Sequence, residues 1–483
     1  MKIQVSELME RSGVGFGTSG ARGLGEAMTD GVCRGYTRAF LDHLRDTGRY
    51  TGGSVALAGD HRPSTPRIMR AVAAAIRDAG GEVINCGAIP TPALACYGIR
   101  QHMPSIMVTG SHIPDDRNGI KFHTADGEIL KADEAGIAAR EIDMLEAVDM
   151  ADGLPDVDSA AADAYVRRYV DFFPRDMLAG WRLGLYEHSS VAREVFARIL
   201  QGLGAEVVRL GYSERFIPVD TEAIRDEDIR LARKWAAECQ LRAIISADGD
   251  GDRPLISTES GEWLRGDVAG ILCARQLGAR AVVTPVSSNT ALEKSGDFDE
   301  IRRTRIGSPY VIEAMRAARA AGFAPVVGYE ANGGFLIETD IEQQSRVLPA
   351  LPTRDAIIVP LALLAMAGDK NVSVSGLLDS LPPRHTASDR IKEMPTEISQ
   401  SRIAELKTGG KVAVSAWLGE ELAPVSSIDT TDGLRLTLAN AEIVHLRPSG
   451  NAPELRCYTE ADSPSRAIEL NRHCLARMAD WRK

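Results

Sequence analysis

The feature that most constrains the fold of this chain is a repeated alternation of short apolar runs with longer helical stretches. Residues 54–62 (SVALAGDHR) and 82–87 (EVINCG) are predicted strands, and residues 65–80 between them are a predicted helix. Strand–helix–strand units of this kind build sheets covered by helices. The pattern returns after a loose stretch at 149–162 and again from about residue 260. The chain therefore predicts three similar mixed α/β domains in succession.

The later part of the chain divides into two regions with different patterns of predicted strands and helices. Strands are expected at 182–187, 206–211, 242–246, 281–286 and 324–329, and helices near 163–173, 190–203, 267–278 and 355–369. Residues 411–456 instead hold several short strand-like runs, followed by a predicted helix at 465–481, which indicates a smaller α+β domain. A chain of 483 residues is too long for one compact core, and we expect domains at 1–150, 151–258, 259–371 and 372–483.

Composition excludes several classes of function. The net charge of −11, without any block rich in lysine or arginine, argues against a nucleic-acid partner. The opening 13 residues lack the apolar core of a signal peptide, and no apolar stretch approaches a membrane-spanning length. We therefore expect a soluble, cytoplasmic protein without a membrane partner. The seven scattered cysteines include no CxxC pair, so neither a disulfide framework nor a structural zinc site is indicated.

The most unusual stretch is MVTGSHIPDDRNGIKF, residues 107–122. Residues 105–109 are a predicted buried strand, and residues 120–122 are a second, shorter one. The loop expected between them is marked by Gly110, Pro114 and the Asn118–Gly119 pair. Ser111 is thus presented at a strand end, where open α/β sheets place groups that contact ligands. Position alone does not distinguish an active serine from one that caps its own loop.

The second stretch, IISADGDGDRPL, concentrates carboxylates in a flexible loop. Asp248, Asp250 and Asp252 alternate with glycine and can converge on one hard divalent cation. Glu259 at the twelfth position imitates a calcium-binding EF-hand, but Arg253 stands where that loop needs glycine, and the preceding residues read as a strand. A Mg²⁺ site with open positions for a phosphate oxygen is the favoured interpretation. A hydrogen-bonded acidic turn is the alternative.

Three further stretches are weaker signals on their own. In LRPSGNAPELR, Arg447 offers a planar fork to phosphate, Ser449 a hydroxyl, and Gly450–Asn451 a turn with backbone N–H groups. In VVGYEANGGFL, a carboxylate and an amide suit vicinal sugar hydroxyls, while in GFGTSGARG Arg22 can bind an anion. Ordinary turns explain each stretch equally well.

Taken together and in this order, the five stretches resemble the α-D-phosphohexomutase superfamily, which includes phosphomannomutases, phosphoglucomutases and phosphoglucosamine mutases. The resemblance covers almost the whole chain and implies a four-domain architecture, with three similar mixed α/β domains and a smaller C-terminal α+β domain around a central cleft. The family's TASHNP loop appears as TGSHIP, which implies that Ser111 carries the phosphoryl group. The family's DGDGDR loop is matched in full by residues 248–253, so that Asp248, Asp250 and Asp252 would hold Mg²⁺ together with Ser111.

The resemblance also assigns the remaining residues. The sugar-recognition turn GExSGH appears as GYEANGG, with Glu330, Asn332 and Gly333 as implied substrate contacts. The phosphate-binding RPSGTxP turn keeps Arg447, Ser449 and Gly450 and has Asn451 in place of threonine. Lys121 is the implied general base with His112 assisting, and Arg22 and Arg253 would stabilise the transferred charge.

The implied reaction moves a phosphoryl group reversibly between the 6- and 1-positions of a hexose phosphate. Phospho-Ser111 would donate to the sugar, and the hexose 1,6-bisphosphate, which serves as intermediate and activator, would turn over in the cleft and return its other phosphate. The pattern looks most like that of bacterial phosphomannomutases, so mannose 6-phosphate is the first expectation. Glucose and glucosamine phosphates are the alternatives.

Three other classes of protein would require different features from this sequence. A serine hydrolase is disfavoured because Ser111 is not in a GxSxG elbow. A Mg²⁺-dependent phosphatase would share the aspartates and the phosphate pocket but would pass the phosphate to water. A non-catalytic module that binds sugar phosphate or calcium would need no serine phosphorylation. The oligomeric state cannot be read from the sequence.

Overall fold

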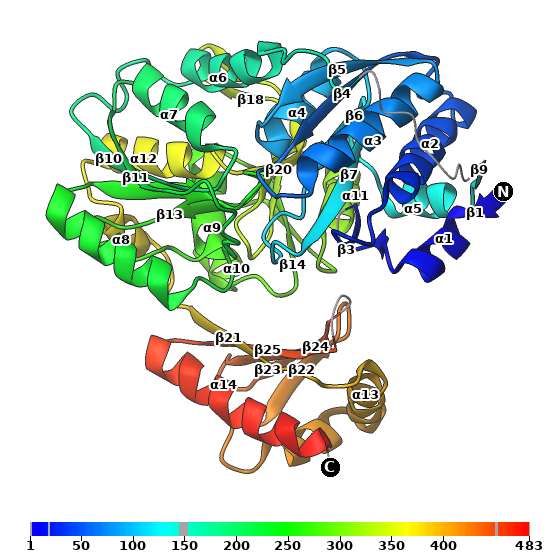
Figure 1. Ribbon diagram of the computed structural model, residues 1–483. Helices are drawn as coiled ribbons and strands as arrows, with labels where there is room; N and C mark the ends of the chain where they lie inside the picture. Colours follow the sequence, from blue (N-terminus) through cyan, green and yellow to red (C-terminus); the bar gives the residue numbers. More distant parts are fainter. Residues whose placement is uncertain (1, 18–19, 144–152, 450–452, 483) are drawn as a thin grey trace.

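The computed structural model describes residues 2–17, 20–143, 153–449 and 453–482. Figure 1 shows two masses: the first three main sheets lie together in the upper one, and the C-terminal region lies below as a smaller one. The strands of the four main sheets fall within residues 15–128, 182–256, 281–355 and 385–461. Each range lies inside one of the four expected domains, while the domain boundaries themselves stay a prediction.

The first sheet has the strand order β2-β3-β7-β6-β4-β5, with β8 paired to β7. Its strands are β2 (Gly15–Phe16), β3 (Ala21–Leu24), β4 (Gly53–Gly59), β5 (Gly81–Gly87), β6 (Ser105–Val108), β7 (Arg117–Thr124) and β8 (Gly127–Glu128). The strands β4, β5 and β6 are parallel to one another, while β7 runs antiparallel to both β6 and β3. The expected strand–helix–strand unit is therefore present as β4, α3 and β5.

The sequence predicted one helix in this part, at 65–80, and α3 begins and ends close to that position, whereas the other four helices were not predicted. The helices of this part are α1 (Val5–Ser12), α2 (Asp30–Asp46), α3 (Thr65–Asp78), α4 (Thr91–Arg100) and α5 (Lys131–Ala138). A short pair, β1 (Lys2–Gln4) with β9 (Glu141–Asp143), ties the start of the chain to the end of this part. Apolar residues of α2, α3 and one face of the sheet form a core of their own.

The Asn118–Gly119 pair was wrongly expected in a loop; it lies inside β7. The side chain of Asn118 is buried and donates to Ser64 Oγ (2.8 Å) and Thr65 Oγ1 (3.0 Å). These hydrogen bonds hold the strand against the start of α3, so Asn118 is not a turn residue. A Cβ at Gly119 would lie 2.7 Å from the carbonyl oxygen of Ala21, which explains why glycine is needed where the strands approach closely.

The second sheet has the order β11-β10-β12-β13 and the third β15-β14-β16-β17-β20. Their strands are β10 (Arg182–His188), β11 (Glu206–Tyr212), β12 (Ala243–Ala247), β13 (Pro254–Ile256), β14 (Ala281–Pro285), β15 (Glu300–Thr304), β16 (Val326–Tyr329), β17 (Phe335–Ile337) and β20 (Leu351–Asp355). A small hairpin joins β18 (Ile341–Gln343) and β19 (Arg346–Leu348). In both sheets an antiparallel pair follows the parallel strands: β12 with β13 in the second sheet, and β16 with β17 in the third.

The helices around these two sheets are α6 (Ala160–Phe172), α7 (Arg193–Gly202), α8 (Asp226–Cys239), α9 (Gly266–Gln276), α10 (Ala291–Ser295), α11 (Ser308–Ala320) and α12 (Ile358–Lys370). Buried apolar side chains from Ala56 to Leu377 form one continuous core that includes residues of all three of the first sheets and their helices. The first three sheets are therefore held as one block by shared apolar packing.

The C-terminal region follows the short helix η1 (Ser375–Ser380) and has a sheet of order β21-β25-β24-β23-β22. Its elements are β21 (His385–Ile391), α13 (Thr396–Leu418), β22 (Val425–Asp429), β23 (Leu434–Leu438), β24 (Ile443–Pro448), β25 (Leu455–Ala461), α14 (Pro464–Ala479) and η2 (Asp480–Arg482). Its apolar side chains form a separate core. Among the described residues, no helix combines the length and apolar character needed to cross a membrane.

The expectation that strand-like runs begin at residue 411 was wrong for residues 411–418, which continue α13 beyond a kink at Gly410. Val414 and Leu418, four residues apart, are buried, while Val412 is 83% exposed. A strand would place Val412 and Val414 on the same face. Packing of one helical face against the C-terminal core thus outweighs the β preference of the valines.

Candidate active site

Ser111 follows β6 in a sharply bent loop. Its φ angle is 55°, its side chain is buried, and its N–H donates to Thr109 Oγ1 at 2.8 Å. A positive φ is uncommon for a residue other than glycine, and such strained positions concentrate at functional sites.

A fully buried arginine, Arg62, fixes this loop, and the sequence analysis did not single it out. Its Nε donates to Asp60 Oδ2 at 3.1 Å, and its terminal nitrogens donate to the carbonyl oxygens of Ser111 (2.8 Å), Ile113 (2.6 Å), Arg117 (2.9 Å) and Pro114. The ring of Phe216, from the second part of the chain, lies 4.0 Å from the guanidinium carbon. One cation thus organises several carbonyl groups of the serine loop.

Arg62 also explains the glycine before the serine. A Cβ added at Gly110 would lie 2.6 Å from the guanidinium carbon of Arg62. This distance is well below a normal contact, so a side chain at position 110 would displace the arginine that holds the loop.

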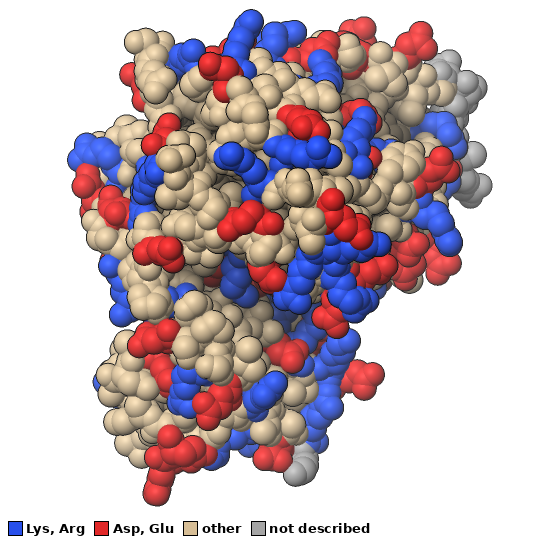
Figure 2. All heavy atoms as spheres, turned by 90° about the vertical axis from the view of Figure 1, so that its left-hand side faces the viewer, with Lys and Arg blue, Asp and Glu red and all other residues tan. Residues whose placement is uncertain are grey.

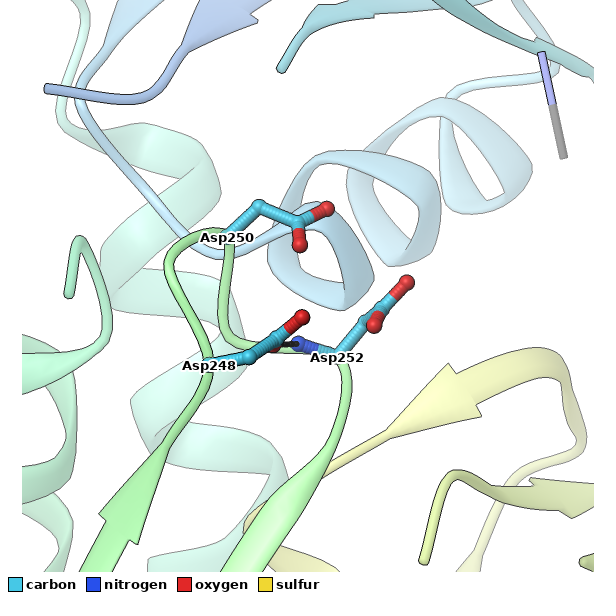
Figure 3. A group of neighbouring side chains, drawn as sticks. All are labelled: Asp248, Asp250 and Asp252. Carbon is cyan, nitrogen blue, oxygen red and sulfur yellow. Dashed lines mark hydrogen bonds between the residues drawn. The ribbon is translucent and has the colours of Figure 1, made fainter. Parts of the chain in front are cut away.

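The three aspartates lie on the loop between β12 and β13, and their side chains converge (Figure 3). One carboxylate oxygen from each of Asp248, Asp250 and Asp252 lies within 4.8 Å of the other two. Ser111 Oγ donates to Asp248 Oδ2 at 2.6 Å, which joins the serine loop to this cluster. The EF-hand interpretation is wrong because the loop joins two antiparallel strands, and Glu259 instead accepts hydrogen bonds from Ser375.

The cluster fits a divalent cation on two observations. Burial and the neighbouring carboxylates of Asp250 and Asp252 raise the pKa of Asp248 to about 8, because three negative charges are crowded together away from water. Asp250 Oδ1 and Asp252 Oδ1 are buried and have no hydrogen-bond partner among the described residues. Hard carboxylate oxygens that lack partners are the ligands that Mg²⁺ prefers. We take these residues as the candidate metal site.

Lys121, on β7, reaches the same cluster. Its Nζ lies 2.6 Å from both Asp250 Oδ2 and Asp252 Oδ2, and only 3% of its side chain is exposed. Lys121 faces the cluster because the register pairs it with Met107 on β6, directly before the serine loop. The serine, the aspartates and the lysine predicted as a base are therefore brought together.

Arg354, on β20, is a second residue that the sequence analysis missed. Its Nε donates to Asp252 Oδ2 at 3.1 Å, its Nη2 lies 2.9 Å from the same oxygen, and its Nη1 lies 3.4 Å from Glu330 Oε2. Its side chain is 2% exposed, so the metal loop and the sugar-recognition turn are bridged by a buried cation. The sequence offered one signal for Arg354. It lies directly before an apolar helix, and an arginine buried there needs an anionic partner.

The predicted cations Arg22 and Arg253 add positive charge beside the three aspartates. Burial, together with repulsion from Arg253 and Arg354, lowers the pKa of Arg22 to about 10. Arg253 Nε is buried without a hydrogen-bond partner among the residues described, and it lies 3.8 Å from Asp252 Oδ1. Cations crowded in this way favour an anionic ligand such as phosphate.

His112 lies beside the serine in an environment that disfavours its charged form. Burial and the positive charges of Arg253 and Arg22 lower the pKa of His112 well below its usual value. Its Nδ1 is 3.4 Å from Ser111 Oγ. A neutral imidazole at this place can exchange a hydrogen bond with the serine without adding charge to the site.

The turn predicted to recognise the sugar joins β16 and β17. Asn332 Oδ1 accepts from the N–H of Gly334 at 2.9 Å, and Thr221 Oγ1 donates to the Asn332 carbonyl at 2.7 Å. Gly333 has a φ angle of 89°, and a Cβ there would lie 2.9 Å from the Pro254 side chain. The turn thus packs against Pro254, the residue that follows the loop of the three aspartates, and this packing brings Glu330 toward the aspartates.

The residues predicted to bind phosphate lie on the C-terminal region. Arg447 is near the end of β24, and its Nε donates to Asp432 Oδ1 at 3.0 Å. Ser449 is buried, and its main-chain N–H donates to the carbonyl of Glu454 at 2.8 Å. The predicted contacts Gly450 and Asn451 lie outside the described residues. The structure therefore gathers the other predicted residues in the block and leaves Arg447 and Ser449 on the smaller mass.

A buried serine facing three aspartates at the junction of three α/β units, with a separate C-terminal sheet, defines a phosphohexomutase fold and site. Models of phosphoglucomutase/phosphomannomutase match this chain for α/β/α domain I (residues 13–144), α/β/α domain III (265–385) and the C-terminal domain (399–473). The chain belongs to the phosphoglucomutase/phosphomannomutase family, and its relatives include a phosphomannomutase from Salmonella muenchen, 44% identical over 96% of this chain and 95% of that protein.

Two further comparisons agree. A phosphomannomutase from Sinorhizobium fredii is 45% identical over 94% of this chain and 96% of its own. The crystal structure of a putative phosphomannomutase from Thermus thermophilus superimposes with a TM-score of 0.73, covering 96% of this chain and 99% of that chain. At 20% identity, the latter supports the fold alone.

Proposed function

We propose that this protein interconverts hexose 6-phosphate and hexose 1-phosphate through a phosphorylated Ser111, with mannose phosphate as the preferred substrate. The observation that carries the proposal is the 2.6 Å hydrogen bond from Ser111 Oγ to Asp248, within the cluster that also holds Lys121 and Arg354. A serine positioned against clustered carboxylates and cations suits phosphoryl transfer, in which positioning and charge stabilisation supply most of the catalysis.

Each buried group has a distinct part in the transfer. Arg62 holds the Ser111 loop so that Oγ faces Asp248, while Arg22 and Arg253 offer donors to the oxygens of the transferred group. Asp248, Asp250 and Asp252 would hold Mg²⁺, which when bound would neutralise phosphoryl charge. Lys121 Nζ is the group nearest the cluster that can exchange a proton with an attacking sugar hydroxyl. Burial of the site excludes water, which protects the phosphoserine from hydrolysis.

The substrate must present each of its two ends to Ser111 in turn. A hexose 1,6-bisphosphate that turns over needs one anchor for the phosphate that is not reacting, and Arg447 and Ser449 with the neighbouring Gly450–Asn451 turn are the candidates. Figure 2 shows a hollow between the two masses, with Lys and Arg side chains inside it and along its right-hand edge. This hollow is where we place the substrate.

The sugar preference rests on the relatives and on the recognition turn. Two relatives at 44% and 45% identity are named phosphomannomutases. We propose that Glu330 and Asn332, with Gly333 allowing the close turn, contact the sugar hydroxyls. Mannose and glucose phosphates differ in one hydroxyl, and glucose or glucosamine phosphate is the alternative substrate. A cytoplasmic location stays a prediction.

The experiment supplies purified protein with the 1-phosphates of mannose, glucose and glucosamine, Mg²⁺ and a trace of the matching bisphosphate. We expect one 6-phosphate to form fastest, and we expect activity to disappear with a chelator and return with Mg²⁺. Release of free phosphate in place of a 6-phosphate would identify a phosphatase and overturn the proposal. Equal rates for the three sugars would overturn the mannose preference alone.

A further inference from the structure

Asp432, at the turn between β22 and β23, connects the two masses through both of its carboxylate oxygens. Its Oδ1 accepts from Arg447 Nε at 3.0 Å, within the C-terminal region. Its Oδ2 accepts from the main-chain N–H of Ile306 at 2.9 Å, on the loop between β15 and α11 of the block. Only 17% of the side chain is exposed. One side chain thus contacts both the candidate phosphate anchor and the block.

The turn that carries Asp432 is itself held in place. His445 on β24 hydrogen bonds through Nε2 to the Asp432 carbonyl oxygen at 2.6 Å. Gly433 has a φ angle of 77°, and a Cβ there would lie 2.3 Å from the carbonyl oxygen of Leu446. The turn therefore packs directly against the strand that ends at Arg447, so Asp432 cannot shift without moving that strand.

The position of Arg447 makes this contact consequential. Arginine loses considerable rotamer freedom when it is fixed, so an unheld side chain would have to be ordered when the ligand binds. Asp432 takes the inner nitrogen, Nε, and its ion pair does not use the two terminal nitrogens, which form the fork that suits phosphate. The ion pair can therefore orient the arginine without occupying its binding edge.

We propose that Asp432 is a positioning residue: it orients Arg447 toward the hollow, and it does so fully only while the C-terminal region contacts the loop at Ile306. The inference rests on the proposed function only in that Arg447 holds a sugar phosphate. Because the same carboxylate makes both contacts, closure of the C-terminal region and phosphate binding favour each other, and this coupling is reciprocal.

The test measures binding of mannose 6-phosphate and of inorganic phosphate to the unphosphorylated full chain by calorimetry, so that no turnover is needed. Asp432→Asn is expected to weaken binding of both ligands about tenfold, because the charge that orients Arg447 is lost. Asp429→Asn, at the end of β22 just before this turn and with the same change of charge, is the matched control, since Asp429 Oδ1 accepts the local N–H of Thr431. It should change affinity by less than about twofold.

A double-mutant cycle separates positioning from general damage. If Asp432 acts through Arg447, then Asp432→Asn added to Arg447→Ala should change affinity by less than about twofold. An equal loss with and without Arg447, or no loss in either background, would overturn the proposal. If Asp432→Asn fails to fold, Asp432→Glu keeps the charge at the wrong reach and should weaken binding similarly, and wild-type affinity for that variant would overturn it as well.

The outcomes also distinguish this proposal from the proposed function. A wild-type protein that binds mannose 6-phosphate but converts no sugar would contradict the mutase function and leave the positioning role testable. A wild-type protein that converts sugar while Asp432→Asn binds and turns over normally would overturn only the role of Asp432.

Discussion

The candidate site residues are held differently in the block of the first three sheets and in the C-terminal region. In the block, Lys121 and Arg354 are 3% and 2% exposed and each is held by buried carboxylates. In the C-terminal region, Arg447 is 18% exposed and pairs with Asp432. We therefore propose that the chemical step takes place in a dry, rigid site, while the second phosphate is anchored by a part that can adjust.

The junction between the two regions is polar. Arg384 donates to Glu460 Oε1 (2.6 Å), Thr290 N–H donates to Glu460 Oε2 (3.0 Å), and Asn289 Nδ2 donates to the Arg384 carbonyl (2.9 Å). The apolar cores of the two regions are separate. Polar interfaces of this kind are typical of domains that move relative to one another. We therefore expect the hollow to open and close about Arg384.

The largest expected effect is confined to the block. Ser111→Ala should lower kcat by at least about 10⁴-fold, because the group that carries the phosphoryl is absent. Mannose 6-phosphate binding, measured by calorimetry, should remain, since Arg447 lies on the other region. Residual activity above a few per cent of wild type would contradict the phosphoserine cycle.

Lys121→Met tests whether the lysine takes part in the transfer or only neutralises the aspartates. We expect kcat to fall about 10³-fold through lost proton transfer, while the Mg²⁺ concentration for half-activation does not rise, because no ammonium competes for the carboxylates. Initial rates over a range of Mg²⁺ concentrations give both values. Lys234→Met, at an exposed lysine on α8, is the matched control. A change in KM alone would assign Lys121 to binding.

The separate cores predict separate unfolding. Leu436→Ala, in the C-terminal core, should lower the free energy of unfolding of that region by about 3 kcal/mol and leave the transition of the block unchanged. Leu272→Ala, in the shared core of the block, should do the reverse. Urea unfolding can be followed by fluorescence, since Trp417 and Trp481 lie together in the C-terminal region. One transition shifted equally by both variants would show that the regions unfold as a unit.

The smallest effect is expected at the edge of the junction. Arg305 Nε donates to the Thr431 carbonyl at 3.2 Å across the hollow, from an exposed side chain. Arg305→Ala should raise KM about fivefold, equivalent to about 1 kcal/mol, and leave kcat unchanged. A fall in kcat with KM constant would mean that this contact acts on the chemical step, which would weaken the distinction between the two regions.

The sequence predicted the unit of β4, α3 and β5 and the loops of Ser111 and Asp248, because these signals are local, but it did not predict the helices α2, α8 and α11. It missed Arg62, Arg354 and Asp432, whose partners lie far along the chain: 49 residues separate Arg62 from Ser111, and 102 separate Asp252 from Arg354. A carboxylate or guanidinium pattern within one segment gives no information about such pairings. Only the assembled sheets bring these charges within hydrogen-bond distance.

The errors have the same cause. The strand expected at 411–418 is helical because burial of Val414 and Leu418 in the C-terminal core decides the conformation. Asn118–Gly119 is the usual composition of a turn, yet contacts with Ser64 and Thr65 hold it in a strand. In both places, neighbours that are distant in sequence override the local preference.

The continuous core from Ala56 to Leu377 sets an order of events during synthesis on the ribosome. Apolar faces of the first two sheets stay exposed until partners such as α12 can pack against them. The helix α12 leaves the exit tunnel only after more than two thirds of the chain has been made. Until then the nascent chain exposes surface that chaperones bind and that promotes aggregation. The C-terminal region, with its own core, can fold last and alone. Premature stops shortly before residue 377 should therefore yield insoluble chains, whereas stops just beyond it should leave a folded but inactive block.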